Sequence, residues 1–237
     1  MSSVVAAGPR PGLKPLTAWS RAVYVTLALV IAADVYSLVT GIQLYGMWAD
    51  VARGGWVADS VRQYPGVESR YAWSATGQAN TLVVCAVVFI VWFHRVRRNA
   101  GLLTPDGHSK ASGWAIWGWI VPVVWWWFPR RIALDSWQAS TPYAGDAPRS
   151  SGSGVVNLWW AAWLATQFLG QFAGRAYGRA EEPDAIREAL RMLNGCDIVD
   201  ILAALLAIVF VHRLTTLQQH TMDHLPTTPP LSPQPQP

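Results

Sequence analysis

Four long apolar stretches constrain this chain more than any other feature. A helix that crosses a bilayer needs about 20 mostly apolar residues. Hydrocarbon offers no water to backbone N–H and C=O groups, so a spanning segment must be helical. The stretches reach or approach this length at residues 22–47, 81–93 (extended outward by 77–80), 155–173 and 192–211. The sequence therefore predicts an all-α protein, a polytopic membrane helix bundle in the cell membrane.

Composition agrees with a membrane bundle. Charged residues make up 14% of the chain, well below the roughly 25% of soluble domains. We expect one bundle over residues 19–219, between a disordered tail at 1–18 and a proline-rich disordered tail at 220–237. The net charge is +4, but the basic residues cluster beside the apolar stretches. They fit orientation signals, so no nucleic-acid partner is expected.

A fifth apolar segment, residues 114–128, decides the number of spans. It holds six tryptophans, which favour the membrane interface over the bilayer centre. Pro122 and Pro129 interrupt the helical hydrogen-bond ladder. We therefore predict four spans, with this segment entering and leaving on one side or lying in the interface. The alternative is a fifth full span over residues 114–134.

Charge asymmetry predicts the orientation. Residues 94–154 carry seven Lys and Arg against three Asp, whereas the expected loops at 49–75 and 174–191 are balanced. The positive-inside rule then places residues 94–154 and both termini in the cytoplasm. The second and fourth apolar stretches both end in His-Arg, at 94–95 and 212–213. This weak repeat predicts that the His-Arg ends of both stretches lie at the same membrane face.

Three carboxylates fall inside the predicted spans. Asp34 lies near the middle of the first span, where a charge costs at least about 2.5–3.5 kcal/mol. Such a group should face the bundle interior and either pair or stay protonated. The candidate intramembrane polar cluster comprises Asp34, Asp197, Asp200, Gln167, Gln171 and Asn80, with Gln78 as a further donor. Two interpretations stay open, a proton- or cation-linked site and a polar seam that fixes helix register.

Basic and aromatic residues gather at the predicted inner face. This collar consists of Arg95, Arg97, Arg98, Arg130, Arg131, Trp125, Trp126 and Trp127. Anionic lipid headgroups are natural ligands for such a set, although orientation signals alone also explain many of its charges.

Several of these residues form a recognisable pattern. The pattern contains Asn99 after the second stretch, Trp114, Trp119, Pro122, Pro129 and Trp137 in the middle, and the pair Trp159 and Trp160 downstream. It resembles the actinobacterial membrane family called domain of unknown function 4328, over about residues 19–219. The chain departs from that pattern at Val123–Trp126, where the family usually has an Asn, and at Arg130, where it often has Tyr. The resemblance implies a membrane architecture and no established reaction.

No motif for catalysis is present. The five histidines form no H-E-x-x-H pattern, and the chain has no G-x-S-x-G, Walker A or Rossmann glycine motif. We therefore expect no catalytic residue, no metal site and no cofactor. The favoured function is a non-enzymatic membrane module that binds lipids, a second copy of itself or another membrane protein. The alternative is a small proton- or cation-linked transporter or channel-like module that uses the carboxylates.

Overall fold

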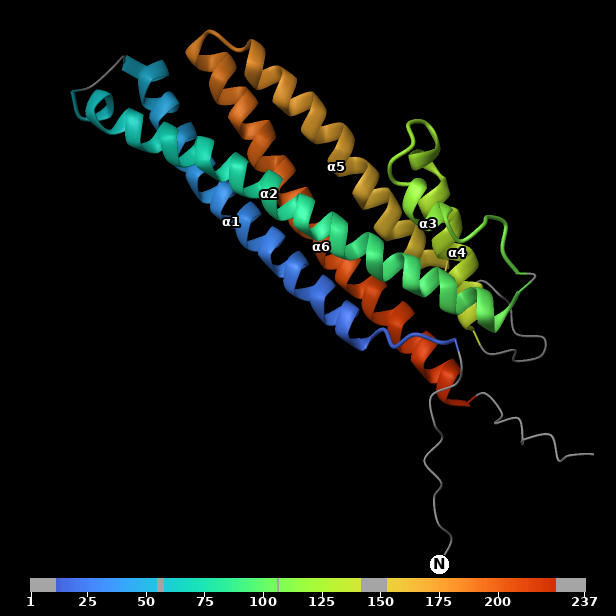
Figure 1. Cartoon of the computed structure of the whole chain (residues 1–237). Coiled ribbons are helices and arrows are strands. Elements are labelled where there is room, and N and C mark those ends of the chain that lie inside the picture. The colour runs from blue at the N-terminus through green and yellow to red at the C-terminus, as the bar shows by residue number, and fades with distance from the viewer. Residues whose placement is uncertain (1–11, 55–57, 106, 142–152, 225–237) are drawn as a thin grey trace, which may run out of the picture.

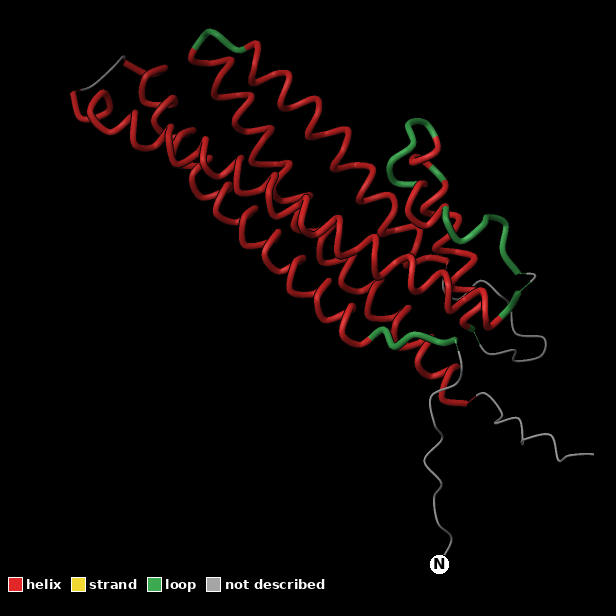
Figure 2. Tube along the Cα trace, in the orientation of Figure 1, coloured by secondary structure: helices red, strands yellow, loops and turns green. Residues whose placement is uncertain are grey.

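The computed structural model describes residues 12–54, 58–105, 107–141 and 153–224. All regular structure in these ranges is helical, which confirms the all-α prediction (Figures 1 and 2). Four long helices lie side by side and run in alternating directions. They are α1 (Thr17–Gly54), α2 (Ala58–Leu103), α5 (Ser153–Arg179) and α6 (Pro183–His224).

Each predicted apolar stretch lies inside one of these long helices. By length and composition, three segments are able to cross a membrane, namely Thr17–Gly54, Arg62–Leu103 and Pro183–His224. α5 has 27 residues, which is long enough, but it is not among these three segments. The 46 residues of α2 rise about 69 Å, roughly twice the hydrocarbon thickness. The helices therefore extend well beyond the apolar stretches that predicted them.

The two predicted loops at 49–75 and 174–191 are wrong. α1 continues to Gly54, α2 already begins at Ala58, and only residues 180–182 separate α5 from α6. Acidic and basic residues three apart support the helix in these regions, and Pro183 starts α6 at the position where a helix tolerates proline best. The supporting pairs are Asp50–Arg53, Asp184–Arg187 and Glu188–Arg191.

α6 is the central helix of the bundle. α1 and α5 pack on two sides of it, and α2 packs along α1 (Figure 1). α2 and α5 approach each other through large rings, with Phe89 and Trp159 centred 5.7 Å apart. Phe210 of α6 stacks on Trp159 at 4.3 Å. The interior between these helices is therefore filled by aromatic side chains.

Residues 114–128 fold back on themselves, and we name this segment the Trp hairpin. It contains α3 (Trp114–Trp117) and a 3-10 turn, η1 (Val124–Trp126), and leads into α4 (Phe128–Ser140). The rings of Trp114 and Phe128 lie 4.9 Å apart, whereas a straight helix would separate these residues by about 21 Å. At the tip, Val123 adopts a φ of 72°. The segment thus begins and ends at the same place and is not one continuous helix.

Both ends of the described part of the chain lie at the end of the bundle that carries the Trp hairpin and α4, which we call the hairpin end. Gln219 donates to the Thr17 hydroxyl over 2.8 Å, and Thr221 donates to the Ser140 carbonyl over 2.6 Å. The predicted tail at 220–237 therefore starts too early, since α6 holds together to His224. Residues 1–11 and 225–237 of the predicted tails lie outside the described ranges.

The bundle has two hydrophobic cores. The larger lies toward the hairpin end and combines aliphatic side chains with buried tryptophan and phenylalanine. The smaller lies toward the opposite end, which we call the turn end, where Leu44, Val67 and Leu190 are buried among partly buried tyrosines. The second core stabilises the helical extensions that the sequence predicted as loops.

Candidate functional site

Two of the three predicted carboxylates meet through one amide. The side-chain nitrogen of Gln78 on α2 donates to Asp34 on α1 and to Asp197 on α6, each over 2.9 Å. Ser37, one turn after Asp34, also directs its hydroxyl to Asp197. We name Asp34, Gln78 and Asp197 the carboxylate bridge. It joins three helices across the bundle interior.

The carboxylate bridge is short of hydrogen-bond donors. Asp34 is 4% exposed, and its Oδ2 atom is buried without a partner among the described residues. No described Lys or Arg forms an ion pair with Asp34 or Asp197. Because both accepting oxygens lie 2.9 Å from one nitrogen, two full charges there would repel by about 3 kcal/mol at an effective dielectric of 20. The arrangement therefore disfavours two full charges.

Some of the other predicted members of the polar cluster lie near the carboxylate bridge, and some do not. Asp200 lies one turn along α6 and near Thr166 of α5, whose hydroxyl donates to the Trp163 carbonyl over 2.9 Å. Gln167 contacts the same hydroxyl over 3.3 Å. Asn80 and Gln171 are exposed on the outside of the bundle, so their predicted place in the cluster is wrong. Asn80 is two residues from Gln78, which turns it to the opposite side of α2.

A close approach of α1 and α6 continues the polar seam toward the turn end. A Cβ atom on Gly41 would lie 2.1 Å from the Asn194 side-chain oxygen and 3.3 Å from the Tyr71 ring. Gly41 thus makes room for a polar side chain of α6, as small residues do at close helix contacts.

The predicted collar does not act as one surface. Arg97 is buried and donates to the Lys110 carbonyl over 2.6 Å, so it fixes the loop after α2. Arg95 lies 4.9 Å over the Trp19 ring, whereas Arg98 is exposed. Arg97 therefore stabilises the fold and is not available to a ligand.

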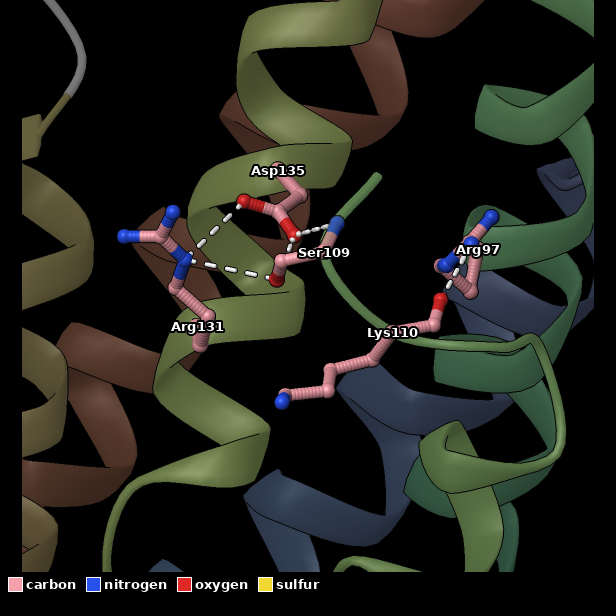
Figure 3. Close-up of polar contacts among 5 residues, drawn as sticks. All are labelled: Arg97, Ser109, Lys110, Arg131 and Asp135. Carbon is pink, nitrogen blue, oxygen red and sulfur yellow. Dashed lines mark hydrogen bonds and ion pairs between the residues drawn. The ribbon is translucent and has the colours of Figure 1, made fainter. Parts of the chain in front are cut away.

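The remaining basic residues surround the base of the Trp hairpin. Lys110 lies 4.7 Å over the Phe128 ring, and Arg130 donates twice to the Asn157 side-chain oxygen, over 3.0 and 2.7 Å. Arg131 lies 3.4 Å from the Asp135 carboxylate and 3.4 Å from the Ser109 hydroxyl. Figure 3 shows how the loop after α2 is held, with the Lys110 carbonyl accepting from Arg97 and Ser109 contacting Arg131 and Asp135 of α4. We name Lys110, Arg130 and Arg131 the basic cluster.

Asp135 is a network residue that the sequence analysis counted only as a charge. Its carboxylate accepts two hydrogen bonds from Ser109, from the backbone N–H over 2.9 Å and from the hydroxyl over 2.6 Å. It is 5% exposed. The spacing of Arg131 and Asp135, four apart on one helix, was the available signal for this ion pair.

The tryptophans of the collar and the motif have two environments. Trp119 touches rings from two helices, among them Phe89 at 5.7 Å and Trp163 at 5.5 Å. Trp126 packs against Phe168 of α5 at 5.0 Å. On the protein-facing side we also find Trp114, Trp125, Trp137, Trp159 and Trp160. Trp127 is half exposed on the outside.

The remaining motif residues hold the backbone. Asn99 is fully buried and exchanges two hydrogen bonds with the backbone of Lys14, one over 3.0 Å and one over 2.9 Å. Pro129 is buried in the first turn of α4, and Pro122 is exposed near the hairpin tip. Asn99 therefore attaches the segment before α1 to the end of α2.

Among the described residues, no group of three or more His, Cys, Asp and Glu side chains is placed to hold a metal ion.

Comparisons with other proteins give one match. Residues 67–216, more than half of the chain, match a family described as "Domain of unknown function (DUF4328)". The matched region contains the Trp hairpin, two of the three residues of the carboxylate bridge and all of the motif residues. No curated protein and no solved structure matches the chain significantly.

Proposed function

The chain belongs to the DUF4328 family, and from this premise we propose that it is a multi-pass protein of the cell membrane, with both termini in the cytoplasm. In this proposal it has no enzymatic activity. Its function is to bind lipids, a second copy of itself or another membrane protein.

The distribution of side chains is the observation that carries the proposal. Val83 on α2 is 63% exposed, and Asp34 on α1 is 4% exposed. Each long helix turns large apolar side chains outward, such as Leu29, Val87, Phe172 and Leu202. Water would make this arrangement costly, whereas hydrocarbon favours it and drives polar groups into the bundle.

The geometry of the Trp hairpin supports four membrane crossings. On α5, Asn157 contacts Arg130 at the hairpin base, and Phe168 contacts Trp126 near the tip. These two residues of α5 are separated by a rise of about 16 Å along the helix. That is close to half of a hydrocarbon core, and the hairpin returns to its starting level at Phe128. In this topology α5 is the fourth span, and its exposed residues Leu158, Phe168 and Leu169 face lipid.

Cysteine mapping tests the topology. Cys85 and Cys196 are replaced by Ala, and single cysteines are placed at Ser112 and Thr141 on the two sides of the hairpin and at Gly54 and Glu182 at the turn end. Intact cells are then labelled with a membrane-impermeant thiol reagent. We expect labelling at Gly54 and Glu182, and protection at Ser112 and Thr141 until lysis.

Each contrary pattern removes a different part of the proposal. Opposite behaviour of Ser112 and Thr141 would mean that the hairpin crosses the membrane, as the five-span alternative requires. Equal behaviour of Thr141 and Glu182 would mean that α5 does not cross. Release of the protein from membranes by alkaline carbonate would remove membrane insertion altogether.

A second candidate function is proton- or cation-linked transport through the carboxylate bridge. The Asp34 Oδ2 atom, which has no partner among the described residues, favours this function, because a buried acceptor without a donor can bind a proton or a cation. The test measures the collapse of a pH gradient or a Na⁺ gradient in proteoliposomes. Asp34→Asn should abolish flux, whereas Asp223→Asn, which changes an exposed residue of α6, should not. Absence of flux in the unmodified protein would leave the bridge as a structural seam.

A further inference from the structure

We infer that the basic cluster at the base of the Trp hairpin binds the phosphate headgroup of an anionic phospholipid, whose acyl chains lie along the exposed face of the hairpin. This inference rests on the proposed membrane insertion and names the ligand class and the residues that would contact it.

The three cations of the basic cluster come from the two chain segments that flank the base of the hairpin. Lys110 comes from the loop before the hairpin, and Arg130 and Arg131 come from the first turn of α4. Lys110 reaches the ring of Phe128, the residue that closes the hairpin, over 4.7 Å. The hairpin base therefore carries three cationic side chains, one before it and two after it.

These charges are incompletely neutralised by the protein. Lys110 lies on an aromatic ring and Arg130 on a neutral amide. Asp135 is the only described carboxylate that forms an ion pair with the cluster, and it also accepts two hydrogen bonds from Ser109. Three cations against one carboxylate leave a positive excess, and α4 starts without a side-chain cap, which adds partial positive charge. An anion complements this site.

The apolar face beside the cluster identifies the anion as a lipid. Trp117, Ile120 and Val123 of the hairpin are each more than half exposed, and Trp127 is half exposed. Trp119, Trp125 and Trp126 turn the other way and pack against rings of α5. Phe168 of α5, which packs against Trp126, is itself more than half exposed. A free anion or an acidic peptide would leave this face uncovered, whereas acyl chains cover it.

The test compares two lipids with identical acyl chains. The full chain, purified in neutral detergent, is titrated with dioleoyl phosphatidylglycerol or dioleoyl phosphatidylcholine, and binding is measured by native mass spectrometry. We expect about tenfold tighter binding of the anionic lipid. The triple variant K110Q/R130Q/R131Q should reduce the preference to less than about twofold. Glutamine at position 130 retains a donor for Asn157, and gel filtration checks that the variant keeps its fold.

A matched triple variant at the turn end serves as the control. R53Q/R187Q/R191Q removes the same charge from arginines that each have a carboxylate three residues away, and it should keep the full preference. Lys110→Gln alone, which breaks only a contact with a ring, should lower the preference by about threefold. This single variant keeps the inference testable if the triple variant does not fold.

Five outcomes overturn the inference. Equal binding of the two lipids by the unmodified chain excludes selection of the headgroup. An unchanged preference in K110Q/R130Q/R131Q, or an equal loss in the control, places selection elsewhere. Full competition by glycerol 1-phosphate would reduce the site to a phosphate site without acyl contacts. Loss of the bound lipid when two copies of the chain associate would show that the exposed hairpin face is used for self-association. A protein that resists carbonate extraction yet shows no lipid preference defeats this inference alone, whereas one that is extracted defeats the proposed function.

Discussion

The two ends of the bundle treat their arginines differently. At the turn end, three arginines each lie near a carboxylate three residues away on the same helix. At the hairpin end, Arg95 and Arg130 lie against a ring and an amide, and Arg97 donates to a backbone carbonyl. Local charge balance at one end and positive excess at the other is the pattern expected of a protein that meets an anionic surface at one end only.

The two hydrophobic cores also differ in the polarity of their side chains. The hairpin-end core contains buried tryptophan and phenylalanine among aliphatic side chains, and the turn-end core contains several partly buried tyrosines. Tyrosine keeps a polar atom that prefers a nearby partner or water. The turn-end core is therefore the more polar of the two, and ring packing is concentrated around the Trp hairpin.

The sharpest test of this contrast is Gly118→Ala in the hairpin. Its Cβ would lie 2.6 Å from the Trp114 carbonyl oxygen and 3.3 Å from the Phe128 Cβ, so backbone has to move. We expect a loss of about 3 kcal/mol in the free energy of unfolding in mixed micelles. Gly154→Ala, where a Cβ meets nothing within 4 Å, is the control. Equal stability of the two variants would mean that the hairpin is loosely packed.

Asn99→Ala should have the next largest effect. The change removes both hydrogen bonds to the Lys14 backbone and leaves buried groups without partners, at a cost of about 2 kcal/mol. Limited proteolysis should then cut the segment before α1 sooner than in the unmodified chain. Asn80→Ala, an exposed residue of the same helix, should behave like wild type. Resistance of the Asn99 variant to cleavage would show that other contacts hold the segment.

Gly41→Ala tests the seam toward the turn end and should cost less. The group in its way is the Asn194 side chain, which can rotate, so we expect a loss of about 1 kcal/mol. Gly46→Ala on the same helix meets nothing within 4 Å and should be neutral or slightly stabilising. If both variants are equally stable, α1 and α6 do not require a small residue where they approach.

The smallest effect is expected from Arg191→Gln at the turn end. Arg191 is 68% exposed where it pairs with Glu188, and exposed pairs of this kind contribute at most about 0.5 kcal/mol. The free energy of unfolding should also be insensitive to salt. A larger loss at the turn end than at Asn99 would reverse the comparison between the two ends.

The sequence predicted the helices and the fold-back better than the connections. Apolar runs located α1, α2, α5 and α6, and proline with tryptophan indicated that residues 114–128 would not form a straight span. The charges of residues 49–75 and 174–191 predict loops, yet acidic and basic residues three apart support a helix there. Polar residues in the sequence predict where an apolar stretch ends, but they do not predict where the helix ends.

The polar cluster could be predicted in kind but not in its full membership. Asp34 and Asp197 were placed inside the bundle because hydrocarbon excludes charge. Which amide serves them depends on the rotation of α2, and that rotation is set by large packed rings such as Trp92 and Phe93. Gln78 therefore faces the carboxylates and Asn80 does not.

The packing of α1 against α6 has a consequence for how the protein is made. In chain order α1 precedes every other described helix, yet it packs against α6, which follows all of them. During translation Asp34 can meet Gln78 once α2 has formed, but Asp197 arrives only with α6. The side of α1 that α6 covers therefore stays without its partner helix until α6 has been synthesised. In the proposed membrane topology, a truncated chain that lacks α6 would expose the Asp34 carboxylate to lipid.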